Sequence, residues 1–80
     1  MNIVFTLHAL ERMKKRGVAQ VEVLECLRDP DRLMKLDDVY RAVRRLGSEV
    51  LVVVYRKEDD TVIVITIYRS SKVRKYLGVT

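Results

Sequence analysis

One histidine and two arginines follow one another at four-residue intervals near the start of the chain. His8, Arg12 and Arg16 lie in the segment TLHALERMKKRG, residues 6–17, and His8 is the only histidine of the 80 residues. Residues spaced by four lie along one side of a helix. An imidazole transfers protons near neutral pH, and guanidinium groups bind phosphate through paired hydrogen bonds. The spacing therefore indicates either a site for a phosphate or an ordinary solvated helix face.

Each of these residues has a simpler structural role that stays open. A histidine at the start of a helix can dock that helix by a hydrogen bond to a neighbouring strand. Arg12 is as well explained by a surface ion as by a phosphate contact. Lys15 and Arg16 could bind RNA, but cations are favoured at the C-terminal end of a helix in any case.

A second group of candidates lies near the end of the chain. Tyr68 and Arg69 end a strongly apolar segment, and Tyr76 follows among three cations, Lys72, Arg74 and Lys75. An aromatic ring beside cations suits RNA, because the ring stacks on a base while the charge meets the backbone. Tyr68 could equally be a core residue, since strict alternation places it with Val62, Val64 and Thr66. Tyr76 is expected to dock the chain end rather than to stack on a base.

The composition has an excess of basic residues and excludes several kinds of functional site. There are 16 Lys and Arg against 11 Asp and Glu, a net charge of +5, which favours a polyanionic partner. The high charged fraction, with only two side-chain amides, equally fits a heat-adapted protein. One histidine and one cysteine cannot form a zinc site, and no glycine-rich phosphate loop is present, so no metal or cofactor is expected. Cys26 lies in an apolar helical run and is interpreted as a small buried residue.

Helical periodicity accounts for the first part of the chain after a short strand at residues 2–6. A helix is predicted over residues 7–16, capped by Thr6 and ended by Gly17, with Leu7 and Leu10 on its apolar side. A second helix is predicted from about residue 19 to 28, where Asp29-Pro30 stops it.

After Pro30 the period changes to that of strands. Strands are predicted at residues 32–36, 39–46, 49–57 and 61–69, and the last two are the most apolar. Residues from about 70 form a basic tail or one short helical turn. Arg41, Arg44 and Arg45 are interpreted as solvated or paired with Asp37 and Asp38. The alternative that they line a sheet surface facing RNA stays open. The prediction is one α+β domain over residues 1–80, in which two N-terminal helices pack on one face of an antiparallel sheet.

The segment His-Ala-x-x-Arg-Met-x-x-Arg-Gly-Val, residues 8–18, followed by a helix ending in Asp-Pro and by a sheet, resembles the RelE/ParE/BrnT toxin superfamily. The resemblance implies a RelE-like β-α-α-β-β-β(-β) fold in a prokaryotic protein. It also implies the toxin of a toxin–antitoxin module, and within this superfamily a metal-independent endoribonuclease that cuts mRNA, on the ribosome in some members. His8, Arg12, Tyr68 and Arg69 are then the catalytic candidates, with a cognate antitoxin as protein partner.

A second interpretation stays open: a non-enzymatic member of the same fold that binds RNA or another protein. A third, more distant one is gyrase inhibition without RNA chemistry. No segment has the length of a membrane span or the pattern of a signal peptide, so a cytoplasmic location is expected. Exposed strand edges would allow a homodimer.

Overall fold

The first part of the chain forms one strand and two helices in the computed structural model, which describes residues 2–78. The elements are β1 (Asn2–Phe5), α1 (Leu7–Arg16) and α2 (Gln20–Arg28). The Thr6 hydroxyl accepts a hydrogen bond from the backbone N–H of Ala9 at 3.1 Å, which caps α1. Gly17 ends α1 in the left-handed conformation, with φ of 64°, as the sequence predicted.

The rest of the chain forms four strands and a short third helix. They are β2 (Arg32–Leu36), β3 (Val39–Leu46), β4 (Glu49–Glu58), β5 (Thr61–Ser70) and α3 (Val73–Leu77). The four predicted strands are confirmed, and the basic tail begins with the helical turn that was one of its two expected forms. The α+β class is confirmed as well.

The sheet is mixed rather than antiparallel, which corrects the prediction. Its strand order is β1-β5-β4-β3-β2, and β1 runs parallel to β5 while the other neighbours are antiparallel. The first and last strands of the chain can lie side by side in parallel because the two helices and three strands between them form the required crossover.

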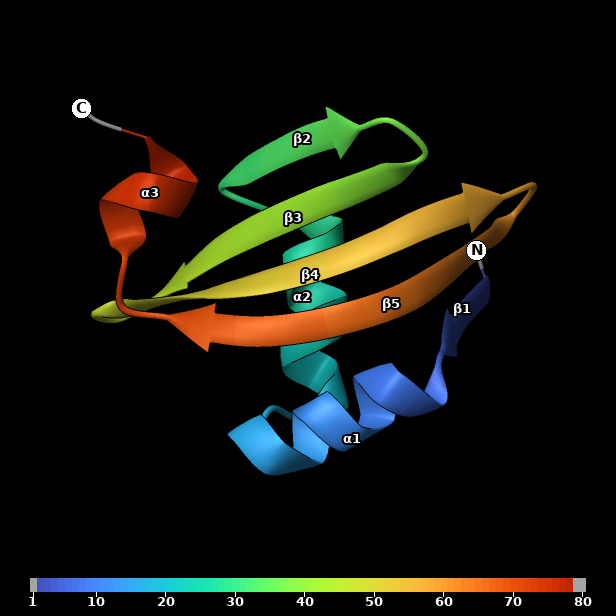
Figure 1. The fold of residues 1–80 in the computed structure, drawn as a ribbon, viewed down its shortest axis with the longest axis horizontal. Coiled ribbons are helices and arrows are strands. Elements are labelled where there is room, and N and C mark those ends of the chain that lie inside the picture. The colour runs from blue at the N-terminus through green and yellow to red at the C-terminus, as the bar shows by residue number, and fades with distance from the viewer. Residues whose placement is uncertain (1, 79–80) are drawn as a thin grey trace.

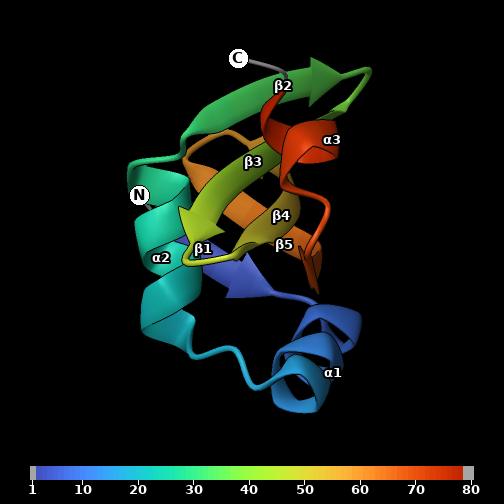
Figure 2. The same cartoon turned by 90° about the vertical axis from the view of Figure 1, so that its left-hand side faces the viewer.

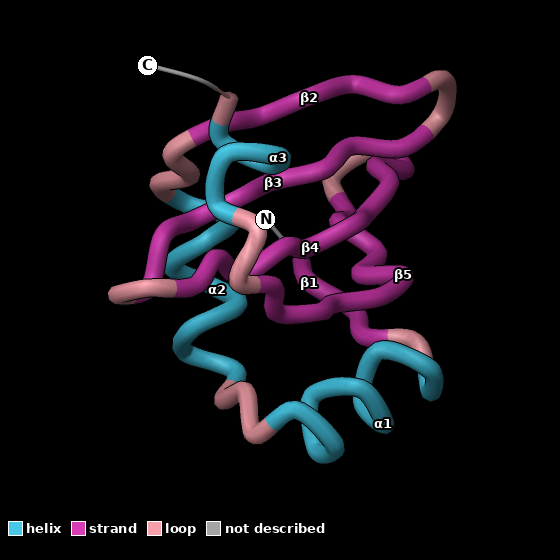
Figure 3. The backbone as a smooth tube through the Cα atoms, turned by 60° about the vertical axis from the view of Figure 1, so that its left-hand side comes forward, coloured by secondary structure: helices cyan, strands magenta, loops and turns pink. Residues whose placement is uncertain are grey.

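The helices cover different parts of this sheet. In Figure 1, α2 passes behind the sheet, α1 lies along β5 below it, and α3 lies at the left-hand end. The quarter-turned view of Figure 2 shows α2 and α3 on opposite sides of the sheet. The tube of Figure 3 shows the short loop that joins α1 to α2. The sheet therefore has an α2-side face and an α3-side face, which we name accordingly.

Each face has its own apolar core. Side chains that alternate along β3, β4 and β5 meet α1 and α2 on the α2-side face: Ala42, Leu51, Val53 and Ile67, with Met13, Val23 and Cys26 from the helices. The intervening side chains Val43, Val50 and Val52 form a smaller core with Tyr76 on the α3-side face. The chain end thus covers part of the face that the two N-terminal helices leave open.

A β-bulge in β5 decides which face its last residues occupy. Tyr55 of β4 pairs with Val64 and Val54 pairs with Thr66, so Ile65 is an extra residue without a partner on β4. The carbonyl of Ile65 accepts a hydrogen bond from the Thr6 hydroxyl at 3.0 Å, which ties the bulge to the start of α1.

The bulge makes the predicted grouping of Tyr68 wrong. Val62 and Val64 face the α2 side, whereas Thr66 and Tyr68 pair with Val54 and Val52 on the α3 side. An inserted residue reverses the alternation beyond it, and strict alternation from the sequence could not include that reversal.

The predicted apolar side of α1 is also partly wrong. Ala9 and Met13 are buried, but Leu7 is 79% exposed and Leu10 40%. α1 lies along β5 instead of across the middle of the sheet, and β1 pairs only with the first half of that strand. The helix therefore buries a narrower stripe than its apolar residues would fill.

Candidate functional site: tyrosines and an arginine under α3

Two tyrosines from distant parts of the sequence meet on the α3-side face. Tyr68 comes from the end of β5 and Tyr76 from α3, and their rings form an edge-to-face pair with centroids 5.7 Å apart and planes at 63°. Tyr76 is only 8% exposed, because its ring packs on Val43, Val50 and Val52. The expectation that Tyr76 docks the chain end is confirmed.

Arg41 reaches this pair from β3. Its guanidinium carbon lies 5.4 Å from the centroid of the Tyr76 ring, a cation–π distance. Its Nη2 donates to the sulfur of Met34 at 3.2 Å, and its Nε is buried without a hydrogen bond. No carboxylate pairs with Arg41 within residues 2–78. Arg41 also hydrogen-bonds the Tyr68 phenol. A guanidinium carries five N–H donors, so part of its hydrogen-bonding capacity is left for an anion.

Further cations lie around the pair. Lys75 places its Nζ 5.3 Å from the centroid of the Tyr76 ring. Arg32 donates from Nη1 to the carbonyl of Tyr76 at 3.3 Å, which fixes α3 over β2 and β3. Lys72 and Arg74 are exposed beside them. We call Arg41, Tyr68, Lys75 and Tyr76 the tyrosine–arginine site.

The surroundings of the two phenols shift their acidities in opposite directions. Burial raises the pKa of Tyr68 above its ordinary value, and its hydrogen bond to Tyr76 raises it further. The hydrogen bond from Tyr68 lowers the pKa of Tyr76, with help from the nearby charges of Lys75 and Arg41 and against the effect of burial. A pair whose pKa values are pushed apart can serve as a base and an acid, here Tyr76 and Tyr68.

His8 docks α1 against β5, the strand that carries Tyr68. Its Nε2 lies 3.0 Å from the Oγ1 of Thr66, two residues before Tyr68 on the same face of β5. The predicted docking contact is therefore confirmed, and a catalytic role for His8 stays a prediction. Arg12 lies one turn further along α1 and is half-buried, while Lys15 and Arg16 are exposed.

Arg69 faces away from Tyr68, since neighbouring residues of a strand point to opposite faces. Its Nη1 donates to the carbonyl of Arg16 at 3.4 Å, and its Nε lies 3.4 Å from the Oε1 of Glu49. The second distance is that of an ion pair without hydrogen-bond geometry, because the same Nε has no hydrogen-bond partner. The four catalytic candidates are therefore not brought together in one pocket.

Arg41 is the residue to which the sequence interpretation gave too little weight, since a role facing RNA was only the second alternative for it. It was grouped with Arg44 and Arg45 as solvated or paired with Asp37 and Asp38. Arg44 instead pairs with Asp29, at 3.4 Å, and Arg45 donates its backbone N–H to the Oδ2 of Asp31 at 2.7 Å. The available signal was alternation, which places Arg41 between Val39 and Val43 on an apolar face.

Within residues 2–78 no group of three or more His, Cys, Asp or Glu side chains could hold a metal ion. None of the three helices described there has the length and apolar character that a bilayer crossing requires. Cys26 is fully buried, and burial raises the pKa of its thiol from 9.0 to about 12, which keeps it protonated.

One protein family matches the chain. It is described as a domain of unknown function (DUF4258), and it matches residues 5–69. No curated protein and no solved structure matches the chain. The match includes Arg41 and Tyr68, and it ends before Tyr76.

Proposed function

The chain belongs to the DUF4258 family, a domain of unknown function, and we propose that it is a metal-independent endoribonuclease whose catalytic centre is the tyrosine–arginine site. In this proposal it is the toxin of a prokaryotic toxin–antitoxin module, a RelE-like protein that acts on mRNA. The β-α-α-β-β-β-β order is compatible with that fold, as is a C-terminal helix that brings basic and aromatic residues onto the sheet.

The observation that carries the proposal is the hydrogen bonding of Arg41. A half-buried guanidinium whose partners are the Met34 sulfur and the Tyr68 phenol, and whose Nε is buried without any hydrogen bond, costs free energy that an apolar side chain would not cost. The cost is offset when an anion enters and accepts those hydrogen bonds. Phosphate fits the planar donor set of arginine, and Lys75 adds a second positive charge.

The proposed reaction needs no other atoms than those of RNA and the two phenols. Tyr76 is the base in this reaction, because its surroundings lower its pKa, and its phenolate form takes the proton of the 2′-hydroxyl. The 2′-oxygen bonds to the adjacent phosphorus while the bond to the 5′-oxygen breaks, and Tyr68 donates its proton to that leaving oxygen. The products are a 2′,3′-cyclic phosphate and a 5′-hydroxyl. Arg41 and Lys75 stabilise the charge that builds on the phosphate.

The remaining sequence candidates have supporting roles in this proposal. Arg12, Lys15 and Arg16 on α1, with Lys72 and Arg74 beside α3, contact the RNA backbone on either side of the cleaved bond. His8 holds α1 against β5 through Thr66. Arg69 fixes the end of α1 through the Arg16 carbonyl and takes no part in the chemistry. An antitoxin that covers the basic surface, a cytoplasmic location and a homodimer belong to the same proposal.

A second candidate function is RNA binding without cleavage. It is favoured by the burial of Tyr76. This residue is 8% exposed, and its ring holds α3 on the sheet. In that case Arg41 and the cations around α3 bind the phosphate backbone, and the tyrosines are structural.

The test uses purified protein and single-stranded RNA in the presence of a metal chelator, with and without ribosomes. We expect fragments that end in cyclic phosphate, and no cleavage of RNA whose 2′-hydroxyls are methylated. Arg41→Ala and Tyr76→Phe should slow cleavage by about 10²-fold or more. Arg56→Ala is the matched control, because it removes one positive charge from β4 where Arg56 already pairs with Glu58.

Three results would decide between the alternatives. RNA bound but never cut supports the second candidate function. If Arg41→Ala and Tyr76→Phe cut RNA as fast as the wild type, the catalytic centre lies elsewhere on the molecule. If the protein neither binds nor cuts RNA, and its expression in a bacterial host leaves growth and RNA intact, both candidates are wrong.

A further inference from the structure

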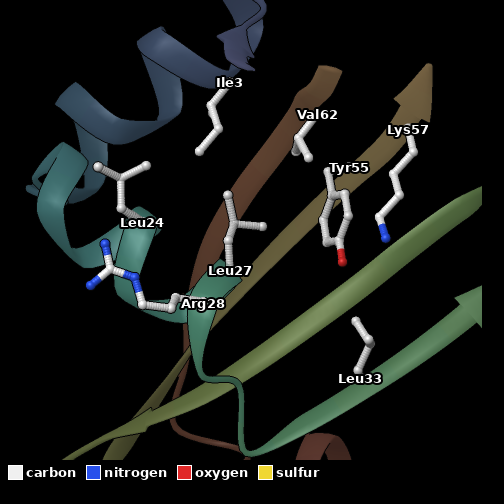
Figure 4. Close-up of a pocket in the computed structure, with 8 residues that line it drawn as sticks. All are labelled: Ile3, Leu24, Leu27, Arg28, Leu33, Tyr55, Lys57 and Val62. Atoms are coloured by element: carbon white, nitrogen blue, oxygen red, sulfur yellow. The ribbon is translucent and has the colours of Figure 1, made fainter. Parts of the chain in front are cut away.

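An apolar cavity opens on the α2-side face, away from the tyrosine–arginine site. Its volume is about 410 Å³, within the range of small-molecule sites. Its walls are aliphatic and come from α2 and three strands: Ile3, Leu24, Leu27, Leu33 and Val62 (Figure 4).

The cavity exists because α2 is short. Nine helical residues extend about 14 Å, whereas the ten residues of β4 extend about 33 Å. α2 therefore covers only part of its face. Leu33 remains 53% exposed at the edge strand β2, an apolar side chain at the mouth of the cavity.

Two of the three polar residues that line the cavity, Tyr55 and Lys57, lie toward one end. Tyr55 contributes a ring to the wall, and Figure 4 shows its hydroxyl and the amino group of Lys57 directed to the same side. The Tyr55 ring stacks on Tyr40, with centroids 5.3 Å apart and planes at 15°. The Nζ of Lys57 and of Lys35 lie 5.1 Å and 5.8 Å from the Tyr40 centroid.

These two lysines have no carboxylate partner within residues 2–78. Burial raises the pKa of Tyr55, so its hydroxyl stays a neutral hydrogen-bond donor. One end of the cavity thus presents the positive charge of Lys57 and a phenol, and most of the other lining residues are aliphatic. Arg28 adds a second positive charge at the α2 side of the cavity.

We propose that this cavity binds a small anionic amphiphile, an alkyl or aryl carboxylate whose apolar part lies among Leu24, Leu27 and Val62 and whose carboxylate meets Lys57 and the Tyr55 hydroxyl. The size of the cavity favours a small molecule over a protein partner. A stable protein interface needs about 800 Å² from each partner, far more than eight lining residues supply. The charge at one end favours an acid over a neutral lipid.

The test is a titration of the full chain with hexanoate, octanoate and decanoate, each below its micelle concentration, followed by the methyl NMR signals of Leu27 and Val62. Each added methylene should tighten binding about fourfold. Octanol, which has the same apolar part without the charge, should bind more weakly than octanoate.

Two variants and a matched control complete the design. Lys57→Met keeps the aliphatic stem, removes the charge and should weaken octanoate binding about threefold or more. Leu24→Phe fills part of the cavity and should reduce binding of decanoate more than that of hexanoate. Lys14→Met removes an equal charge from exposed α1 and should change nothing.

The proposal is overturned if no carboxylate binds saturably, if octanol binds as tightly as octanoate, or if the shifted signals lie on the α3-side face. These results do not depend on RNA cleavage, so the cavity and the tyrosine–arginine site are tested separately.

Discussion

The guanidinium of Arg41 lies over the ring of Tyr76, 5.4 Å from its centroid, although the two residues belong to a central strand and to the last helix. The contact joins the sheet to α3, and it leaves the Nε of Arg41 buried without a hydrogen bond. An arrangement that is costly in the free protein and favourable with an anion is typical of a binding site.

Replacing Arg41 by methionine should separate stability from function. Arg41→Met keeps an unbranched apolar chain beside Met34 and removes the unsatisfied donors, so the free energy of unfolding should stay unchanged or rise by about 1 kcal/mol. RNA binding should fall at the same time. Denaturant unfolding measures the first effect. A loss of more than about 2 kcal/mol would mean that Arg41 is mainly structural.

The two tyrosines should titrate as an interacting pair. Because a hydrogen bond from Tyr68 lowers the pKa of Tyr76, Tyr68→Phe should raise the pKa of Tyr76 toward its ordinary value. The ring carbon signals of Tyr76, followed by NMR as the pH rises, give its midpoint in the wild type and the variant. Tyr40→Phe is the control, since Tyr40 lies on the other face and stacks on Tyr55. An unchanged Tyr76 midpoint in Tyr68→Phe would refute the hydrogen bond between the two phenols.

Cys26 should make the protein sensitive to alkali. Burial raises the pKa of its thiol from 9.0, the value for the unfolded chain, to about 12 in the folded protein. Between pH 9 and pH 12 the unfolded state therefore binds fewer protons than the folded state. The contribution of the protonated thiol to the free energy of unfolding is complete below pH 9 and is lost as the pH rises toward 12. The expected slope is about 1.4 kcal/mol per pH unit.

Cys26→Ala removes this pH dependence of the free energy of unfolding. It should cost about 1 kcal/mol at pH 7 through lost packing, yet equal or exceed the wild type in stability near pH 11. Denaturant unfolding at pH 7, 9, 10 and 11 measures the crossover. If the difference in the free energy of unfolding between the wild type and Cys26→Ala stays constant with pH, the thiol does not titrate as described.

The contact between His8 and Thr66 should matter for stability more than for activity. Both groups are partly solvated, so His8→Ala should lower the free energy of unfolding by about 0.5–1 kcal/mol. In a double-mutant cycle, Thr66→Val should cost little more once His8 is absent. If stability is unchanged in His8→Ala while RNA cleavage is lost, His8 is catalytic and not only a docking residue.

The sequence predicted the elements well because each has a local signal. Thr6 and Gly17 mark the ends of α1, and the apolar alternation of β4 and β5 marks the strands. The direction of β1 had no such signal, because pairing between the two ends of the chain is decided by tertiary contacts.

The candidate site was predicted only in part for a related reason. Tyr68 was identified, but the bulge at Ile65 moved it to the α3-side face and left Arg69 on the other. Arg41 could not be distinguished from Arg45 by type or exposure pattern. Only the position of α3, which covers part of the face where Arg41 lies, separates the two.

The most direct test is the affinity for a single-stranded RNA with methylated 2′-hydroxyls, which can be bound but not cut, measured by fluorescence anisotropy over a range of salt concentrations. We predict that Arg41→Ala weakens binding about tenfold and lowers the salt slope by about one, because one phosphate contact is lost. Arg56→Ala, with the same change in net charge at the far end of the α3-side face, should bind as the wild type does. Equal losses in the two variants would show that RNA is attracted by net charge alone and would contradict a site at Arg41.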